Sequence, residues 1–533
     1  MPGLPKTQQA VQLVGPDELR VNYAKPVAEP GSHQILARVE VAGLCYSDLK
    51  LLKQFSAHAR KSAVAAGIDP KLLSEMPNYV PGSLPAVPGH EAVVRVVRAG
   101  PKVVRHKVGQ RYLVQTDYRW LPTASSNAAF GYNFEGALQE YVLFDERVII
   151  SPGGESMLIP VPENLPASAL ALIEPWACVE NSYAETQRRT LKPGGRLLVA
   201  GDVPVDEGVL RAVPGHPSFM KVTTIDRIAE ADQASFDDIV YFGSNVASVE
   251  SLFPKLAAGG LMNVVRGGSR FGRSVVVPLG RIHYGGIRIV GTAAATPESA
   301  MAAIPPSGEI CCNDRINIVG AAGPMGSMHV VRNLCLGIEG VEVCAGDFSD
   351  ERLDVLRRVA EPLARRHRLE FTAYNPRKKA PAGTFNYIVL MVPVAGLIPQ
   401  AIASAERHAI INIFAGIPAE TMLAIDLDAY VEKQLYFVGT SGSVLSDMNR
   451  VLAKVIERRL DTNLSVAAVA GLDGAIDGIR AVEKNLMTGK IIVYPSCRGL
   501  PLKSIGELGD VPLENGHWCG RSEDALLRIY GGP

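Results

Sequence analysis

Three short segments carry side chains suited to metal and proton chemistry. They contain Cys45, Ser47, Asp48, His90, Glu91 and Glu174. Zinc prefers thiolate, imidazole and carboxylate ligands, and a catalytic zinc keeps one position open for water or substrate. We therefore predict a catalytic zinc site with Cys45, His90 and Glu174 as the three protein ligands.

The neighbours of these ligands suit supporting roles. Ser47 lies two residues after the thiolate, close enough to exchange a proton with a zinc-bound alcohol. Asp48 and Glu91 are placed to orient the imidazole or the metal as outer carboxylates. Two alternative ligands remain: Glu91 itself, and Cys178, one helical turn after Glu174, which also suits a packed position on a helix.

The contexts of these residues resemble the zinc-dependent medium-chain dehydrogenase/reductase family of alcohol and polyol dehydrogenases. The segments that carry the resemblance are 41–48, 87–91, 108–112, 136–142, 172–175 and 488–495. It implies a GroES-like, β-rich catalytic domain and a Rossmann-type domain. Leu172-Ile173-Glu174-Pro175 is similar to the sorbitol-dehydrogenase-like branch, in which this Glu binds zinc directly or through a water.

Two features depart from that family. Residues 53–82 form an insertion before His90, and its stretch 56–75 is rich in Ala, which predicts a helix. The insertion either caps the substrate or decorates the surface. No Cys occurs between Gly109 and Leu143, so the four-Cys structural zinc lobe has no counterpart, and we expect one catalytic zinc per chain.

Two regions alternate apolar strand-like runs with helical stretches, a pattern typical of parallel sheets covered by helices on both faces. The runs are 196–200, 221–226, 238–242, 261–265 and 287–292, then 315–319, 341–345, 387–391, 409–413 and 435–440. The predicted fold class is α/β, with a GroES-like catalytic domain and two Rossmann-type domains. The predicted domains are residues 1–185 (completed by about 460–500), 186–306, 307–460 and a C-terminal extension, 496–533.

The second copy has the features of a dinucleotide site. Its first strand leads into a glycine turn that opens a helical stretch, where amides and the helix N-terminus favour a pyrophosphate. The predicted cofactor-binding residues of this turn are Gly320, Ala322, Gly323, Pro324, Met325 and Gly326. Asp347 follows the next strand and suits the adenosine ribose hydroxyls while repelling a 2′-phosphate, so we predict NAD rather than NADP.

The first copy lacks these features. Its turn, 201–208, carries three carboxylates, Asp202, Asp206 and Glu207, where a pyrophosphate would lie. Like charge repels a dinucleotide there. We interpret this copy as a degenerate, scaffold-type Rossmann domain.

The composition argues against several classes of protein, including nucleic-acid-binding and membrane proteins. Lys plus Arg and Asp plus Glu number 54 each, so nothing points to nucleic acid or an anionic membrane surface. No apolar run is long enough for a membrane helix, and no signal peptide is visible. The eight scattered Cys fit a reducing compartment, so we expect a cytoplasmic protein. The resemblance implies a homo-oligomer, a dimer or tetramer.

The predicted reaction is reversible oxidation of a secondary alcohol to a ketone, with NAD(H) as hydride carrier and a polyol or sugar as substrate. Two alternatives remain open. One is reduction of a phosphorylated ketose. The other is a non-catalytic NAD-binding sensor or scaffold.

Overall fold

The computed structural model describes residues 4–203, 205, 207–210, 213–440 and 442–532. Asp206, one of the three carboxylates named above, lies outside these residues. The chain forms two compact units, unit 1 (Met1–Ala177 with Ser443–Pro533) and unit 2 (Cys178–Gly442). In the described part, no helix has both the length and the apolar character needed to cross a membrane.

Unit 1 is built on an eight-stranded sheet. Its strand order is β25-β23-β24-β3-β4-β5-β9, with β8 paired to β3. The bounds are β3 (Gln34–Gly43), β4 (Glu91–Ala99), β5 (Arg111–Val114), β8 (Tyr141–Asp145), β9 (Leu158–Pro160), β23 (Val466–Ala470), β24 (Lys490–Val493) and β25 (Lys503–Ser504). Gly43 pairs with Glu91 on one side and Ile492 on the other. This register brings the ends of three distant segments to one place.

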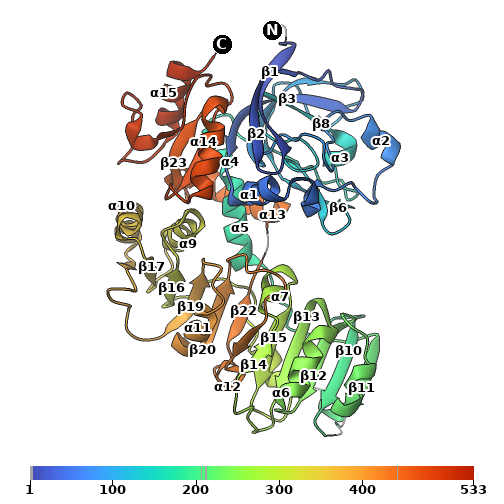
Figure 1. Cartoon of the computed structure of the whole chain (residues 1–533). Coiled ribbons are helices and arrows are strands. Elements are labelled where there is room, and N and C mark those ends of the chain that lie inside the picture. The colour runs from blue at the N-terminus through green and yellow to red at the C-terminus, as the bar shows by residue number, and fades with distance from the viewer. Residues whose placement is uncertain (1–3, 204, 206, 211–212, 441, 533) are drawn as a thin grey trace. The chain divides into compact units, whose positions relative to one another are not determined.

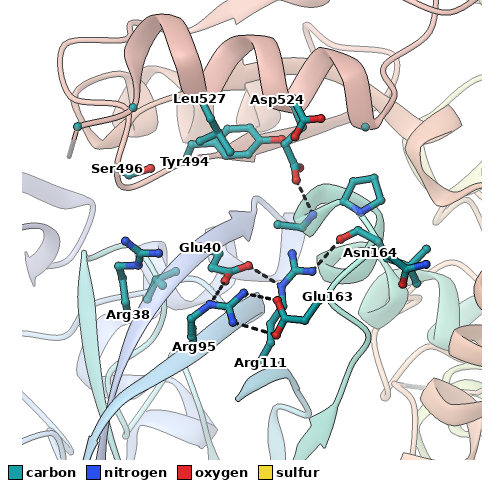
Figure 2. A pocket seen from close by; sticks show the side chains of 18 residues that line it. Arg38, Glu40, Arg95, Arg111, Glu163, Asn164, Tyr494, Ser496, Asp524 and Leu527 are labelled. Carbon is teal, nitrogen blue, oxygen red and sulfur yellow. Dashed lines mark hydrogen bonds and ion pairs between the residues drawn. The ribbon is translucent and has the colours of Figure 1, made fainter. Parts of the chain in front are cut away.

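The C-terminal extension is part of unit 1. Its helix α15 (Gly520–Tyr530) buries Glu523, whose carboxylate accepts the backbone N–H groups of Ala167 and Ser168 at 2.6 and 2.8 Å. These amides begin α4 (Ala167–Ala171), so a charge from the extension caps a helix of the catalytic lobe. Between α15 and the sheet lies a cleft of about 580 Å³, in which Arg95 and Arg111 share the carboxylate of Glu40 (Figure 2).

Unit 2 contains the two predicted parallel sheets (Figure 1). The first has the order β11-β10-β12-β13-β15 and the second β18-β17-β16-β19-β20-β22. The first comprises β10 (Arg196–Gly201), β11 (Phe219–Thr224), β12 (Phe236–Phe242), β13 (Leu256–Val265) and β15 (Arg288–Thr292). The second comprises β16 (Arg315–Val319), β17 (Glu342–Gly346), β18 (Glu370–Tyr374), β19 (Phe385–Leu390), β20 (Ala405–Ile413) and β22 (Tyr436–Val438). The predicted fold class is confirmed.

Two local expectations differ from the structure. Strand β18 was not predicted, because its side chains are only partly buried and its sequence lacks an apolar run. Residues 56–75 do not form one helix; they form short 3₁₀ turns at 55–57 and 59–61 and the helix α2 (Pro70–Ser74). Gly67 takes a positive φ of 91° and Pro70 can only begin a helix, which interrupts the Ala-rich stretch.

The two halves of unit 2 pack about an approximate two-fold axis. Strand β14 (Val275–Val277) pairs antiparallel with β21 (Leu423–Ile425), with Val276 opposite Ala424. Val276 and Ala424 are 148 positions apart in the sequence (424 − 276). The first residues of β15 and β22, Arg288 and Tyr436, are separated by the same number (436 − 288). Equivalent elements of the two copies therefore face each other, as in an isologous dimer.

Side chains lock this internal interface. Tyr430 donates its hydroxyl hydrogen to the Ile289 carbonyl at 2.8 Å, and the buried Arg266 pairs with Asp428. One hydrophobic core runs through both copies, from Leu198 and Ile289 to Ile388 and Phe437. The two copies are thus one packing unit.

Candidate metal centre and cofactor turn

The start of α1 (Tyr46–Gln54) organises the first group of predicted site residues. Cys45 is the N-cap, and Asp48 accepts the Cys45 backbone N–H at 3.1 Å. The other carboxylate oxygen of Asp48 lies 3.0 Å from His90 Nδ1, and His90 Nε2 lies 3.2 Å from Ser47 Oγ. Since a carboxylate only accepts, Nδ1 carries a hydrogen, and Nε2 is the nitrogen that faces Ser47 and could bind a metal.

Charge acts on this histidine in two directions. Burial is the largest single influence and lowers the pKa of His90, but the charge and hydrogen bond of Asp48, together with Tyr132 and Cys45, raise that pKa well above its ordinary value. A metal at Nε2 competes with that proton, so metal affinity depends on pH.

Glu91 is fully buried, and its two carboxylate oxygens have different surroundings. Lys490 Nζ donates to its Oε1 at 2.5 Å, and Lys490 is itself buried. Its Oε2 has no hydrogen-bond partner among the described atoms and lies where a Cβ on Gly43 would be. A glycine at position 43 therefore makes room for the carboxylate.

The ligand atoms of Cys45, His90 and Glu91 lie within 4.8 Å of one another. This thiol, imidazole and carboxylate set, with an orphaned carboxylate oxygen, fits zinc. Glu174, on α5 (Ile173–Ala184), is buried but lies outside this trio. Burial raises the pKa of Glu174 to about 7, His90 opposes that rise and Glu91 adds to it, so Glu174 is close enough to sense both.

Sequence reasoning missed the residues that flank this centre. Lys490 is a single charge at the head of an apolar strand, a signal of a buried pair that the sequence does contain. Tyr132 is buried and its ring centroid lies 5.8 Å from that of His90. His58 and Arg60 of the insertion lie against the same tyrosine, at 5.2 Å between ring centroids and 5.4 Å from the guanidinium carbon to the ring. No local pattern marks these three residues.

The glycine turn of the second copy has the geometry of a phosphate-binding turn. Gly320 takes a φ of 82°, and a Cβ on Gly326 would overlap the Gly320 carbonyl. Gly323 is the N-cap of α9 (Pro324–Cys335), which begins with Pro324 and Met325. The turn thus brings backbone amides to a helix N-terminus and fits a pyrophosphate.

Asp347 lies at the edge of this turn. Its carboxylate accepts the N–H groups of Ala322 at 3.3 Å and Ser349 at 3.1 Å. A cavity of about 450 Å³ opens beside it, lined by Val319, Gly320, Gly346, Phe348, Leu390 and Val392 among others. This largely apolar cavity next to a carboxylate fits an adenosine group.

The corresponding turn of the first copy differs in its following element and in the contacts of its Asp202 carboxylate. Among the described residues, β10 is followed by a four-residue 3₁₀ turn, Glu207–Leu210, where β16 is followed by the twelve-residue α9. The Asp202 carboxylate accepts Tyr241 Oη–H at 2.7 Å and the N–H groups of Ser244 and Asn245 at 3.1 and 3.2 Å. The carboxylate of the turn after β10 thus binds amides of the segment that follows β12.

Comparisons with known proteins match part of this chain to alcohol and polyol dehydrogenases. Residues 31–153 match the alcohol dehydrogenase GroES-like domain. Alcohol dehydrogenase 2 of Emericella nidulans is 26% identical over 219 residues, covering 38% of this chain and 50% of that protein. L-sorbose 1-phosphate reductase of Klebsiella pneumoniae is 27% identical over 224 residues, covering 39% and 54%.

The chain spans about half the length of the curated relatives it matches. The crystal structure of 2R,3R-butanediol dehydrogenase from Bacillus subtilis aligns with a TM-score of 0.52 and 16% identity, covering 92% of this chain and all of that one. The sequence likeness thus lies in part of the chain, and the structural likeness concerns the fold.

Proposed function

This chain belongs to the medium-chain dehydrogenase family of alcohol and polyol dehydrogenases, and from that premise we propose that it is an NAD-dependent zinc oxidoreductase. The proposed reaction converts a secondary alcohol, a polyol or sugar, and NAD⁺ into a ketone, NADH and a proton. The observation that carries the proposal is the convergence of Cys45, His90 and a buried carboxylate beside the Ser47 hydroxyl.

The proposed ligands are Cys45, His90 and Glu174, with Glu91 as the alternative third ligand. When bound, zinc supplies Lewis acidity toward the substrate oxygen, and NAD supplies a hydride-accepting nicotinamide. Asp48 holds the imidazole with Nε2 toward the centre. Lys490 offsets the negative charge that the buried Glu91 adds.

Ser47 is the proposed proton carrier. Its Oγ lies 3.2 Å from His90 Nε2 and therefore beside the site of the reacting oxygen. It takes the proton of the substrate hydroxyl and passes it outward.

For the cofactor, we propose that Gly320, Ala322, Gly323, Pro324, Met325 and Gly326 hold the pyrophosphate and that Asp347 binds the ribose hydroxyls. The degenerate first copy binds no dinucleotide, because Asp202 already uses the amides of Ser244 and Asn245.

Metal analysis and a polyol screen test the proposal. We expect one zinc per chain and NADH formation from at least one secondary alcohol, both lost in Cys45→Ser and in His90→Ala. The matched control is Cys312→Ser, an exposed cysteine, which keeps both. A protein that binds zinc and NAD but turns over no alcohol or ketone would support the non-catalytic sensor instead.

A further inference from the structure

A helix of the first Rossmann-type copy contacts the second copy where strand β20 ends, and the proposed function leaves this contact unused. The helix is α7 (Leu279–Tyr284), six residues long. The segment that it contacts, residues 414–421, follows β20, and we call it the β20 loop. Helix and loop both belong to unit 2.

Hydrogen bonds join α7 to both ends of the β20 loop. The buried His283 has its Nδ1 at 3.0 Å from the carbonyl oxygen of Ile413, the last residue of β20. Since a carbonyl only accepts, Nδ1 carries the hydrogen and donates it. Gly280 donates its backbone N–H to the carbonyl of Thr421 at 3.1 Å. The helix thus fixes where the loop leaves β20 and where it turns toward β21.

The middle of the β20 loop lies directly on α7. A Cβ on Gly280 would lie 2.0 Å from the Pro418 carbonyl oxygen and 2.7 Å from that of Ala419. Both distances are too short for any side chain. Gly280 does not take a positive φ, so the close approach of the loop, rather than the backbone conformation, requires glycine at this position.

The other side of the β20 loop contacts the second copy itself. The ring of Phe414, the first residue of the loop, meets the ring of His329 edge-on, with 4.6 Å between the ring centroids. His329 is fully buried and lies on α9, three residues after Gly326 of the glycine turn. The loop therefore lies between α7 and the helix that begins at the proposed pyrophosphate site.

The sheet topology places the β20 loop at the cofactor edge. Strands β16, β19 and β20 run parallel, so the glycine turn and the loop leave the same carboxyl edge of the sheet. The strand order reverses between β16 and β19. A dinucleotide spans such a point with one half on each side. Because Asp347 follows β17 on the adenosine side, the nicotinamide half falls on the side of β19 and β20.

We propose that α7 of the first copy positions the β20 loop against the nicotinamide half of the cofactor, with His283 and Gly280 as the positioning residues. This rests on the proposed function and deepens it. The copy for which we propose no dinucleotide binding then shapes the hydride-accepting end of the site in the other copy. The adenosine half, on the far side of the strand reversal, does not depend on α7.

Two ligands that differ in the nicotinamide test the inference on the full-length protein. NADH binding is followed by its fluorescence, and calorimetry follows ADP-ribose, which keeps the adenosine and pyrophosphate but lacks nicotinamide. We expect Gly280→Ala and His283→Leu each to weaken NADH binding about tenfold and to leave ADP-ribose binding within about twofold. His283→Asn keeps an N–H donor near the place of Nδ1 and should retain most of the affinity for NADH.

The matched control is His216→Leu, the same substitution at an exposed histidine of the first copy, which should change neither affinity. Equal weakening of NADH and ADP-ribose in the α7 variants overturns the inference, because the helix would then support the whole site rather than its nicotinamide half. Unchanged NADH affinity in His283→Leu also overturns it, and this variant decides if Gly280→Ala does not fold. A wild-type protein that binds neither ligand contradicts the proposed function, and the inference with it.

Discussion

Glu91 shows how one residue position sets the chemistry of the centre. Its neighbour in the sheet, Gly43, has no side chain to occupy the place of Oε2, and Lys490 holds Oε1. Removing one partner of a buried ion pair leaves an uncompensated charge, whereas removing both charges is far cheaper. This pair is therefore a sensitive point of unit 1.

We predict that Lys490→Met lowers the free energy of unfolding of unit 1 by about 3–5 kcal/mol, because Glu91 then keeps a buried, unpaired charge. Tryptophan fluorescence during urea unfolding of zinc-free protein measures this, since Trp120, Trp176 and Trp518 all lie in unit 1. Adding Glu91→Gln should restore most of the loss. If the double variant is as unstable as Lys490→Met alone, the pair is not the cause.

The two Rossmann-type copies differ at the scale of one element each. In the second, a twelve-residue helix follows the first strand, and its turn presents amides beside Asp347. In the first, a short 3₁₀ turn stands in that place and Asp202 turns its carboxylate onto the amides that begin α6 (Val246–Leu252). The two copies therefore differ in the element that follows the first strand and in the amides that their carboxylates bind.

We predict that Asp347→Ala weakens NAD binding about tenfold and narrows the preference for NAD over NADP, because the carboxylate that bonds the ribose and repels a 2′-phosphate is lost. Titration calorimetry with both cofactors measures the change. Asp202→Ala is the matched control and should leave the affinity for NAD unaltered. Loss of NAD binding in Asp202→Ala would reverse the assignment of the two copies.

At the scale of the molecule, strands of the first Rossmann-type copy pair with and cover strands of the second. Its strand β14 pairs with β21, and its edge strand β15 lies against β22, so a sheet edge that would otherwise need a partner is covered within the chain. The shared core makes the first copy a structural element of the half for which we propose cofactor binding.

Deleting residues 194–306 should therefore give insoluble or misassembled protein, because the deletion exposes the β22 edge and the apolar surface around Tyr430 and Phe437. Soluble yield and light scattering after size-exclusion chromatography measure this outcome. A soluble deletion protein with full activity and the wild-type oligomeric state would refute the scaffold role.

A single substitution also tests the contact between the two copies, without deleting a domain. Asp428 accepts from Arg266 and from the N–H groups of Phe271 and Gly272, so Asp428→Ala removes three hydrogen bonds and leaves the buried Arg266 with only the partly exposed Glu432 as a carboxylate partner among the described residues. Thermal unfolding of unit 2 should then shift to lower temperature. Glu420→Ala, in the same half of unit 2 and exposed, should leave it unchanged.

The sequence by itself determined the local parts of this protein. Cys45 with Ser47 and Asp48, and His90 with Glu91, could be recognised because each group lies within one short motif. The contact by which Asp48 orients His90 spans 42 positions and is tertiary. The glycine turn of the second copy, the carboxylates of the first and most strands of unit 2 could be read for the same reason: apolar runs and glycine positions are properties of short stretches. The predicted helix at 56–75 was wrong because Gly67 and Pro70 decide the backbone there more strongly than composition does.

Only the tertiary structure decided which distant residues and strands these local segments contact. Lys490 lies 399 positions from Glu91. His58 and Arg60 contact Tyr132, whose ring lies beside His90, from an insertion of unremarkable sequence. The pairing of β14 with β21 joins segments that carry no sign of each other. Such contacts arise because sheet register and core packing bring distant residues together, and burial then makes their charges matter to one another.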